Sequence, residues 1–445
     1  MKTILIIGAG KSSTALIDYL TEQAKPKNRQ VILADISLDL AEKKLKGKPQ
    51  TKAVSLNIEE EEERQKLIKE ADVVVSMLPA FLHGKVAMDC LAFEKHFFSA
   101  SYESEELKVI ADQVRKKNLF FLNECGLDPG IDHMSAMRII DHEKKSGNEI
   151  VLFKSFTGGL LAPECEDNPW KYKFTWNPRN VVLAGKGVSR FIRNGRLKFI
   201  PYHMLFRRTE KISFEDVGDF DGYPNRDSLS YRKVYGLENI PTILRGTLRR
   251  EGFCKSWDVF VQLGLTDDSF QMDLPEDFTM RMFINTFLPY HPDKSVETKL
   301  MEILPHLDED TMNKLEWLGI LGHESLPRFK GSPAEILQEI LESKWQLLPN
   351  DKDMIVMQHQ LEINTGQGQK VITSSLVIKG ENQDQTAMSK TVGLPLAIAV
   401  DLFLEDRFSS RGLMLPIHEE IYEPILKELE KHGIVFKETE TVAQT

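Results

Sequence analysis

The sequence predicts an α/β protein that begins with a doubly wound parallel sheet and continues into a mixed-sheet α/β domain with a helical insertion. Three observations predict this fold class. Unbroken apolar runs, typical of strands buried on both faces, alternate with helical patterns through the first 125 residues. The pattern then changes to mixed strands and loops rich in Gly, Pro and aromatic residues. From about residue 277 to 347 the periodicity is mostly helical.

The first part of the chain contains six short apolar runs that we predict to be strands. They are Thr3–Ile7, Val31–Ala34, Ala53–Leu56, Asp72–Met77, His96–Ala100 and Leu119–Asn123. The helices predicted around them are Ser12–Thr21, Leu38–Gly47, Glu60–Glu70, Phe81–Phe93 and Glu103–Lys117. Strands joined by helices of this length pair in parallel, and ligands of such sheets bind beyond the carboxyl ends of the strands.

The first strand ends at a glycine pair that is typical of a dinucleotide-binding turn. Gly8 would make the tight turn, and Gly10 would let backbone N–H groups approach a pyrophosphate at the positive end of the next helix. Ser13 stands at the third position of the motif, where a small residue still permits close helix–strand packing. Asp35, which ends the second strand, would accept hydrogen bonds from the adenosine ribose. The unit therefore predicts a Rossmann-type site for a nicotinamide or flavin dinucleotide, with a doubly wound domain that has lost its nucleotide as the alternative.

Polar loops that follow the later strands should face the same cofactor. They are Met77–Pro79, Ser99–Tyr102 and Asn123–Cys125. The loop from residue 123 to 133 also carries four groups that could act as acid or base, namely Cys125, Asp128, Asp132 and His133. A metal site here is the weaker hypothesis, because no further ligand follows at a recognisable spacing. Asp132 is also explained as a residue that caps the next helix.

The later elements are predicted from shorter patterns. Strands are expected at Ile150–Phe156, Val181–Ala184 and Tyr202–Phe206, and the inserted helices at Phe278–Phe287, Val296–Leu304, Glu309–Leu321 and Pro333–Trp345. Alternating apolar residues predict a long hairpin from Met354–Ile363 and Lys370–Lys379. Helices Met388–Leu404 and Tyr422–Lys431 and a short strand Ile434–Lys437 complete the chain.

Several arginines stand among Gly, Pro and Asn on predicted loops of the second part. They are Arg179, Arg226, Arg245 and Arg249. A guanidinium fork can contact both oxygens of a carboxylate, so two or three such residues predict a substrate with several carboxylates. For Arg179 and Arg226, an ordinary surface position or an ion pair is the alternative.

Composition excludes several classes of protein. The net charge of −10, with no compensating Lys/Arg-rich block, argues against a nucleic-acid partner. No run approaches the roughly 18 apolar residues of a membrane span, and the start runs directly into a strand, so we expect a cytoplasmic protein without a membrane partner. The cysteines are Cys90, Cys125, Cys165 and Cys254. Their scattered spacing favours free thiols over disulfides or a zinc site.

Eight segments, in order along nearly the whole chain, carry a resemblance to one enzyme family. They are Gly126–His133, Gly158–Gly159, Asp167–Pro169, Tyr172–Phe174, Tyr223–Ser228, Arg245–Arg249, Asp353–His359 and Thr391–Gly393. In these segments the chain resembles saccharopine dehydrogenase of the L-glutamate-forming type, also called saccharopine reductase.

The resemblance implies an arrangement of domains and a reaction. Residues 1–130 would form the dinucleotide-binding domain, completed by about 388–445; residues 131–273 and 348–387 would bind substrate and form a homodimer; residues 274–347 would be the helical insertion. Saccharopine, NAD(P) and water would give glutamate and α-aminoadipate semialdehyde in lysine metabolism.

The resemblance also implies roles for particular residues. Saccharopine would contact Ser101, Tyr102, Asp128, Arg226, Thr247, Leu248 and Arg249. The resemblance implies proximity only; that Tyr102 and Asp128 are the catalytic pair is our hypothesis, because they follow adjacent strands beside the expected nicotinamide. The cofactor would contact Gly8, Gly10, Lys11, Ser12, Ser13, Asp35, Leu78, Ala100, Leu127 and Pro129, and no metal is expected. Asp35 would favour NAD, because its carboxylate would repel the 2′-phosphate of NADP, although some members of the family use NADP.

Two positions depart from the family pattern. Thr157 stands where several fungal members carry a cysteine, which argues against an essential thiol there, and Cys125 replaces an aliphatic residue, so we assign it no role. Two other functions remain open: a dehydrogenase of a related adduct such as carboxynorspermidine, and a non-catalytic dinucleotide-binding protein. Retention of Tyr102, Asp128, Arg226 and Arg249 argues against the latter.

Overall fold

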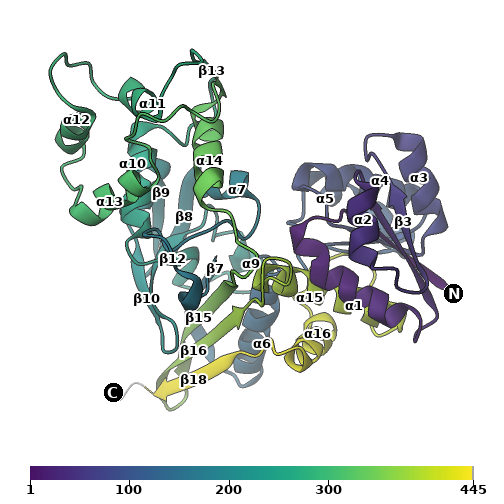
Figure 1. The fold of residues 1–445 in the computed structure, drawn as a ribbon. Coiled ribbons are helices and arrows are strands. Elements are labelled where there is room, and N and C mark those ends of the chain that lie inside the picture. The colour runs from purple at the N-terminus through teal and green to yellow at the C-terminus, as the bar shows by residue number, and fades with distance from the viewer. Residues whose placement is uncertain (443–445) are drawn as a thin grey trace. The chain divides into compact units, whose positions relative to one another are not determined.

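The computed structural model describes residues 1–442, and the chain divides into two compact units (Figure 1). The first unit contains Met1–Ile150, Ile363–Lys370 and the chain from Leu376 onward. The second unit contains Val151–Glu362 and Val371–Ser375.

The first unit is built on a parallel sheet of seven strands within the described residues. Its strands, in spatial order, are β17 (Gly412–Met414), β6 (Phe120–Leu122), β5 (His96–Ser99), β4 (Val73–Ser76), β1 (Lys2–Ile7), β2 (Arg29–Asp35) and β3 (Thr51–Ser55). All six predicted strands are confirmed, and β17 is an addition from the C-terminal part of the chain. The strand order reverses between β1 and β4, where doubly wound sheets bind their ligands.

Helices cover this sheet. They are α1 (Thr14–Ala24), α2 (Leu38–Leu45), α3 (Glu61–Glu70), α4 (His83–Ala92), α5 (Glu105–Lys116), α6 (Ile131–Lys145), α15 (Ala387–Leu404) and α16 (Glu419–Lys431), with the 3₁₀ turns η1 (Lys11–Ser13) and η2 (Ala80–Leu82). Most residues of β1 and all of β4 are buried, as expected for strands covered on both faces. One helix, α15, is long and apolar enough to cross a membrane, but 78% of its apolar window is buried inside the protein.

Helix α15 packs closely on α1, as the yellow-green and purple helices of Figure 1 show. A Cβ on Gly393 would lie 2.8 Å from the backbone nitrogen of Leu16, so only glycine permits this approach. The hydroxyl of Ser389 accepts a hydrogen bond from the backbone N–H of Ala15 at 2.9 Å. The last part of the chain therefore helps to fix the helix that follows the glycine-rich turn.

The second sheet is mixed and has nine strands in the described part of the chain, in the order β10-β11-β12-β7-β15-β16-β18, with β8 joining β12 and β9. Its strands are β7 (Glu149–Leu161), β8 (Val188–Arg193), β9 (Arg196–Pro201), β10 (Glu210–Phe214), β11 (Gly218–Pro224), β12 (Thr242–Arg250), β15 (Asp353–Thr365), β16 (Gly368–Lys379) and β18 (Lys437–Val442). Strand β12 pairs in parallel with β7 and antiparallel with β11.

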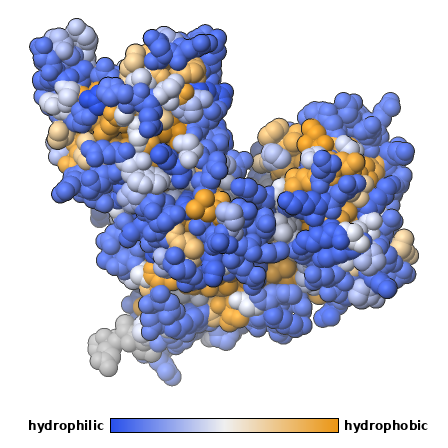
Figure 2. Space-filling view, in the orientation of Figure 1, coloured by the Kyte–Doolittle hydropathy of each residue, from blue (hydrophilic) through white to orange (hydrophobic). Residues whose placement is uncertain are grey.

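Helices of the second unit include the predicted helical insertion. They are α7 (Pro178–Val182), α8 (Tyr202–Leu205), α9 (Tyr231–Val234), α10 (Phe253–Leu263), α11 (Met280–Thr286), α12 (Val296–Ile303), α13 (Glu309–Trp317) and α14 (Pro333–Lys344), with η3 (Pro163–Cys165) and the short strands β13 (Met272–Asp273) and β14 (Lys330–Gly331). An aromatic core holds them together around Trp345, whose ring contacts those of Trp170, Tyr172 and Phe253. The faces seen in Figure 2 are mostly hydrophilic, with smaller hydrophobic patches on both units.

Three sequence predictions about local structure were wrong. The strands predicted at Val181–Ala184 and Tyr202–Phe206 lie in helices α7 and α8. Helix α7 forms because the Asn177 side chain caps it and a proline occupies its first position. The strand predicted at Ile434–Lys437 begins only at Lys437, because the N–H of Ile434 bonds back to the carbonyl of Leu429 and closes α16.

Candidate active site

Three strands of the first sheet end at the same level. Ile7, Ser76 and Ser99 are register partners across β1, β4 and β5. The segments that follow them therefore leave the sheet side by side at its carboxyl edge. This is the edge at which the sequence predicts a cofactor.

The glycine-rich turn after β1 has the geometry that the motif requires. Gly8 has a φ of +107°, and a Cβ there would lie 2.9 Å from the carbonyl oxygen of Met77. Any other residue at position 8 would be strained and would clash. Among residues 1–442, apart from Gly10 and its two chain neighbours, no heavy atom lies within 4 Å of the position that a Cβ on Gly10 would take. The backbone at Gly10 is thus open to an approaching ligand, at the positive end of the helical segment formed by η1 and α1.

Asp35 is fixed beside this turn by two backbone hydrogen bonds. Its Oδ2 accepts from the N–H of Ala9 at 2.7 Å, and its Oδ1 accepts from the N–H of Ser37 at 2.9 Å. Each oxygen retains a lone pair for a ribose hydroxyl. Ile36, the next residue, is 74% exposed. The carboxylate therefore lies where the sequence predicts contact with the adenosine ribose.

The other predicted cofactor residues lie on neighbouring turns. On η1, Lys11 is exposed, Ser12 is half-buried, and buried Ser13 donates a hydrogen bond to the carbonyl of Gly10 at 2.8 Å. Leu78 and Ala100 follow β4 and β5, and Leu127 and Pro129 follow β6. A Cβ on Gly126 would lie 3.0 Å from that of Ala100, so the turns after β5 and β6 are in contact.

The two predicted catalytic residues meet on these turns. The hydroxyl of Tyr102 donates a hydrogen bond to Oδ1 of Asp128 at 3.2 Å. Tyr102 is half-exposed and Asp128 is only partly buried, so a ligand can reach both. The turn that carries Asp128 is closed by a hydrogen bond of 2.9 Å from the N–H of Gly126 to the carbonyl of Pro129.

The remaining polar groups of this loop serve the fold. Buried Asp132 accepts a hydrogen bond from the N–H of Gly130 at 2.6 Å. The prediction that Asp132 caps the next helix was wrong, because Gly130 is the N-cap of α6 and Asp132 lies in the first turn of that helix. Fully buried His133 lies 2.9 Å from a carboxylate oxygen of Glu124, and burial raises the pKa of the Cys125 thiol. Within residues 1–442, no cluster of three or more His, Cys, Asp or Glu side chains has metal-binding geometry.

In the second unit, Arg249 is a buried cation for which the described residues provide no counter-ion. It lies on β12 and is only 3% exposed, with its guanidinium carbon 5.4 Å from the ring centroid of Tyr172 and 5.6 Å from that of Phe253. One of its nitrogens donates to the carbonyl of Leu248 at 3.0 Å. Among the residues that the structure describes, no carboxylate lies within ion-pair distance of it. A buried charge without a partner is costly, which indicates a site for an anion.

The other predicted substrate residues of this unit lie on or beside β12. Thr247 precedes Arg249 by two residues, so both side chains point to the same face of the strand. The hydroxyl of Thr247 donates a hydrogen bond to the side-chain oxygen of Asn225 at 2.7 Å. Leu248 points to the opposite face and is fully buried, so only its backbone can meet a ligand on the Arg249 face. Arg226 is exposed just after β11. Arg179, by contrast, is paired with Asp268 at 3.2 Å.

Comparison with family models accounts for most of the chain. Residues 4–119 match the saccharopine dehydrogenase NADP binding domain, and residues 126–434 match the saccharopine dehydrogenase C-terminal domain. The chain belongs to the saccharopine dehydrogenase family. The domain that carries the glycine-rich turn is accordingly an NAD(P)-binding domain of this family.

Individual proteins that are similar to this chain belong to the same family. Saccharopine dehydrogenase [NADP(+), L-glutamate-forming] of Schizosaccharomyces pombe is 31% identical, over 98% of this chain and 99% of that protein. The mitochondrial alpha-aminoadipic semialdehyde synthase of Bos taurus is 34% identical over 99% of this chain, but the chain spans only about half (48%) of its length. The apo structure of Saccharomyces cerevisiae saccharopine dehydrogenase (L-Glu forming) superposes with a TM-score of 0.90 at 29% identity, covering 99% of this chain and all of that one.

One polar residue at the carboxyl edge of the first sheet was not predicted from the sequence. His83, the first residue of α4, lies 2.8 Å from the hydroxyl of Ser76 and 2.7 Å from that of Ser101. Burial lowers the pKa of His83 to about 4, so the imidazole is neutral, with one nitrogen donating and the other accepting. His83 therefore links the ends of β4 and β5 and orients Ser101, a predicted substrate residue. A lone histidine at the start of a helix gave no signal of this role.

The neutral state of His83 predicts how stability depends on pH. An unfolded histidine has a pKa near 6.5, so between about pH 6.5 and 4 the unfolded chain binds a proton that folded His83 does not. Its contribution should weaken as the pH falls through this window, by up to about 1.4 kcal/mol per pH unit. Calorimetry should show that the Tm advantage of the wild type over His83→Gln shrinks from pH 7 to pH 4. Parallel Tm curves would contradict a neutral His83.

Proposed function

We propose that this chain oxidises saccharopine with NAD(P) and water to L-glutamate and α-aminoadipate semialdehyde, or catalyses the reverse reaction, in lysine metabolism. The observation that carries the proposal is Arg249, a buried cation without an ion-pair partner among the described residues, in a chain that matches an L-glutamate-forming enzyme over 98% of its length. Saccharopine carries several carboxylates that such a guanidinium can hold.

In this proposal, each predicted residue has one role in the reaction. NAD(P) held at the glycine-rich turn would supply the acceptor for the hydride that leaves the ε-carbon of the lysyl part of saccharopine. Asp128 stabilises the positive charge that develops on the substrate nitrogen, and Tyr102 orients the substrate or passes a proton to water. Water then adds to the iminium carbon, and the C–N bond breaks to give amine and aldehyde, with release of one proton overall. Arg226 and Arg249 hold carboxylates and keep the substrate in place.

The decisive experiment is an assay of NAD(P)H absorbance at 340 nm with the purified chain. Saccharopine and carboxynorspermidine should each be offered with NAD and with NADP, and the aldehyde product trapped with a hydrazine. We expect formation of the reduced cofactor and of aldehyde with saccharopine. Turnover of carboxynorspermidine alone would assign the related dehydrogenase activity. Absence of turnover with either adduct would favour a non-catalytic dinucleotide-binding protein.

Cofactor preference is a finer part of the proposal. Asp35 would repel the 2′-phosphate of NADP, so we predict a kcat/KM at least roughly tenfold higher with NAD, and a smaller ratio in Asp35→Ser. Asp39→Ser, on the exposed first turn of α2, is the matched control and should keep the wild-type ratio. The S. pombe relative is named for NADP(+), which makes the measurement informative. Equal values for both cofactors, or a preference for NADP, in the wild type would contradict the prediction.

The remaining parts of the proposal concern assembly and location. The resemblance implies a homodimer, which light scattering of the purified chain would test. A cytoplasmic location and the division into cofactor, substrate and inserted helical parts also remain predictions.

A further inference from the structure

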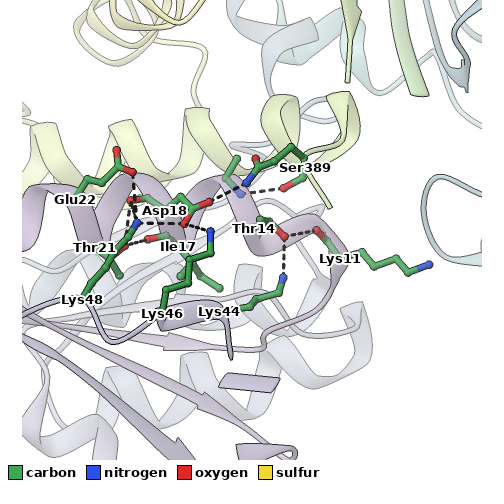
Figure 3. A network of polar contacts seen from close by, with 12 residues as sticks. Lys11, Thr14, Ile17, Asp18, Thr21, Glu22, Lys44, Lys46, Lys48 and Ser389 are labelled. Carbon is green, nitrogen blue, oxygen red and sulfur yellow. Dashed lines mark hydrogen bonds and ion pairs between the residues drawn. The ribbon is translucent and has the colours of Figure 1, made fainter. Parts of the chain in front are cut away.

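The side chain of a lysine is hydrogen-bonded to the glycine-rich turn. Lys44, on the last turn of α2, donates hydrogen bonds from Nζ to the carbonyl of Gly10 at 2.6 Å, to the hydroxyl of Thr14 at 2.9 Å and to that of Ser13 at 3.3 Å. These three acceptors belong to the turn and to the start of α1, and they use all three donors of the ammonium group. Figure 3 shows Lys44 reaching Thr14, whereas the side chain of Lys11 points away from this network.

Two neighbouring lysines make a different kind of contact. Figure 3 shows Lys44, Lys46 and Lys48 side by side along α1. Nζ of Lys46 lies 3.4 Å and that of Lys48 lies 3.2 Å from a carboxylate oxygen of Asp18, so both are ion-paired. Lys44 has only neutral acceptors within hydrogen-bond distance in the described part of the chain. No carboxylate therefore forms an ion pair with Lys44 in this part of the chain. The ammonium group lies beside the turn that we expect to hold the pyrophosphate, so its charge is available to that group.

The surroundings of Lys44 lower the pKa of its ammonium group. Burial is the largest effect and lowers the pKa of Lys44 to about 8. Carboxylates at longer range oppose this effect, namely Asp18 on α1, Asp35 at the end of β2 and Asp384 before α15, whereas the charge of Lys46 adds to it. Lys44 thus begins to lose its charge just above neutral pH.

We propose that Lys44 is a positioning residue for the dinucleotide: it holds the glycine-rich turn and supplies a counter-charge to the pyrophosphate, so that binding takes up a proton above neutral pH. The inference rests on the proposed function only in requiring that NAD(P) bind at this turn. The two negative charges of a pyrophosphate favour the ammonium form of a nearby lysine. By linkage, the dinucleotide must then bind more weakly as Lys44 deprotonates.

The test uses the purified full chain and NADPH as probe, with Kd measured by fluorescence between pH 7.0 and 9.5 at constant ionic strength. In the wild type, Kd should rise with pH above about 8 and level off roughly tenfold above its value at pH 7, where it meets the Kd of Lys44→Gln. Lys44→Arg keeps the charge at every pH, so it should bind like the wild type at pH 7 but without the rise. Lys44→Gln should bind roughly tenfold more weakly at pH 7 and also show no rise. Lys43→Gln, on the exposed face of α2, should behave as the wild type.

Calorimetry at pH 8, in two buffers of different ionisation enthalpy, measures the proton directly. We expect uptake of up to about half a proton per NADPH in the wild type and almost none in Lys44→Arg. NADH should give the same pH dependence, because it shares the pyrophosphate.

Other results of these titrations would contradict either the inference about Lys44 or the proposed function. A pH-independent Kd in the wild type, or an unchanged rise in Lys44→Arg, would overturn the inference, as would a rise seen only with NADPH, which would point to its 2′-phosphate. Failure of the wild type to bind either cofactor at pH 7 would instead overturn the proposed function. If Lys44→Gln does not fold, Lys44→Arg still decides.

Discussion

Replacing Arg249 with methionine should raise the KM for saccharopine by roughly 30-fold or more, since loss of a charged contact to a buried partner costs about 2–4 kcal/mol. The affinity for NAD(P) should be unchanged, because the glycine-rich turn belongs to the other compact unit. Steady-state kinetics with saccharopine and direct titration of the cofactor measure the two quantities. Arg226→Met should give a smaller rise in KM, because Arg226 is exposed and its contacts are screened by solvent.

The same substitution should leave the free energy of unfolding unchanged or raise it. Arg249 is buried without an ion-pair partner among the described residues, so methionine of similar length removes a desolvation penalty. Arg250, the next residue of β12, is an internal comparison, because it is ion-paired with Glu166 at 2.5 Å. Arg250→Met leaves that carboxylate without its partner and should lower the free energy of unfolding by about 3 kcal/mol or more.

Two controls distinguish a loss of substrate binding from a loss of folding stability. Arg208→Met, at an exposed position of the same unit, should change neither KM nor Tm. If Arg249→Met abolished cofactor binding while saccharopine still bound, the assignment of the two units would be wrong. If it instead lowered Tm as much as Arg250→Met does, Arg249 would be a structural residue.

The parts of the fold that could be predicted are those in which one physical signal dominates. Continuous apolar runs located six of the seven strands of the first sheet, because strands buried on both faces need apolar residues at every position. Prediction failed at Tyr202–Phe206, where aromatic residues suggested a strand. That segment follows Pro201 and forms the single helical turn α8, whose Leu205 and Phe206 are buried by packing that the sequence does not reveal. Strand β17 is too short to be recognised without its partner β6.

The candidate site was predictable where the chain order itself brings residues together. Tyr102 and Asp128 follow adjacent parallel strands, so their meeting could be expected. His83 and Lys44 could not be found in this way, because each acts through hydrogen bonds to a segment distant in sequence. Histidines and lysines at the ends of helices are common, and only the structure distinguishes these two from the others.

Replacing Asp128 with asparagine should lower kcat by roughly tenfold or more with little change in the affinity for NAD(P). Asparagine keeps the shape of the side chain and its carbonyl oxygen can still accept the hydrogen bond from Tyr102, so the change is mainly the loss of charge. A carboxylate near the substrate nitrogen stabilises the cation that forms as the hydride leaves, and that stabilisation is greatest in the transition state. The loss should therefore appear in kcat more than in KM.

The alternative for Asp128 is that its carboxylate only stabilises the turn after β6, and two further variants distinguish these roles. Tyr102→Phe removes the hydrogen bond to Asp128 but leaves its charge, so its effect on kcat should be smaller than that of Asp128→Asn. Asp132→Asn, in the same loop, should act through stability instead, because this buried carboxylate accepts the N–H of Gly130. We expect a lower Tm for Asp132→Asn and a wild-type Tm for Asp128→Asn. An unchanged kcat/KM across pH in Asp128→Asn, with a lowered Tm, would assign Asp128 to the turn and leave the developing charge to another group.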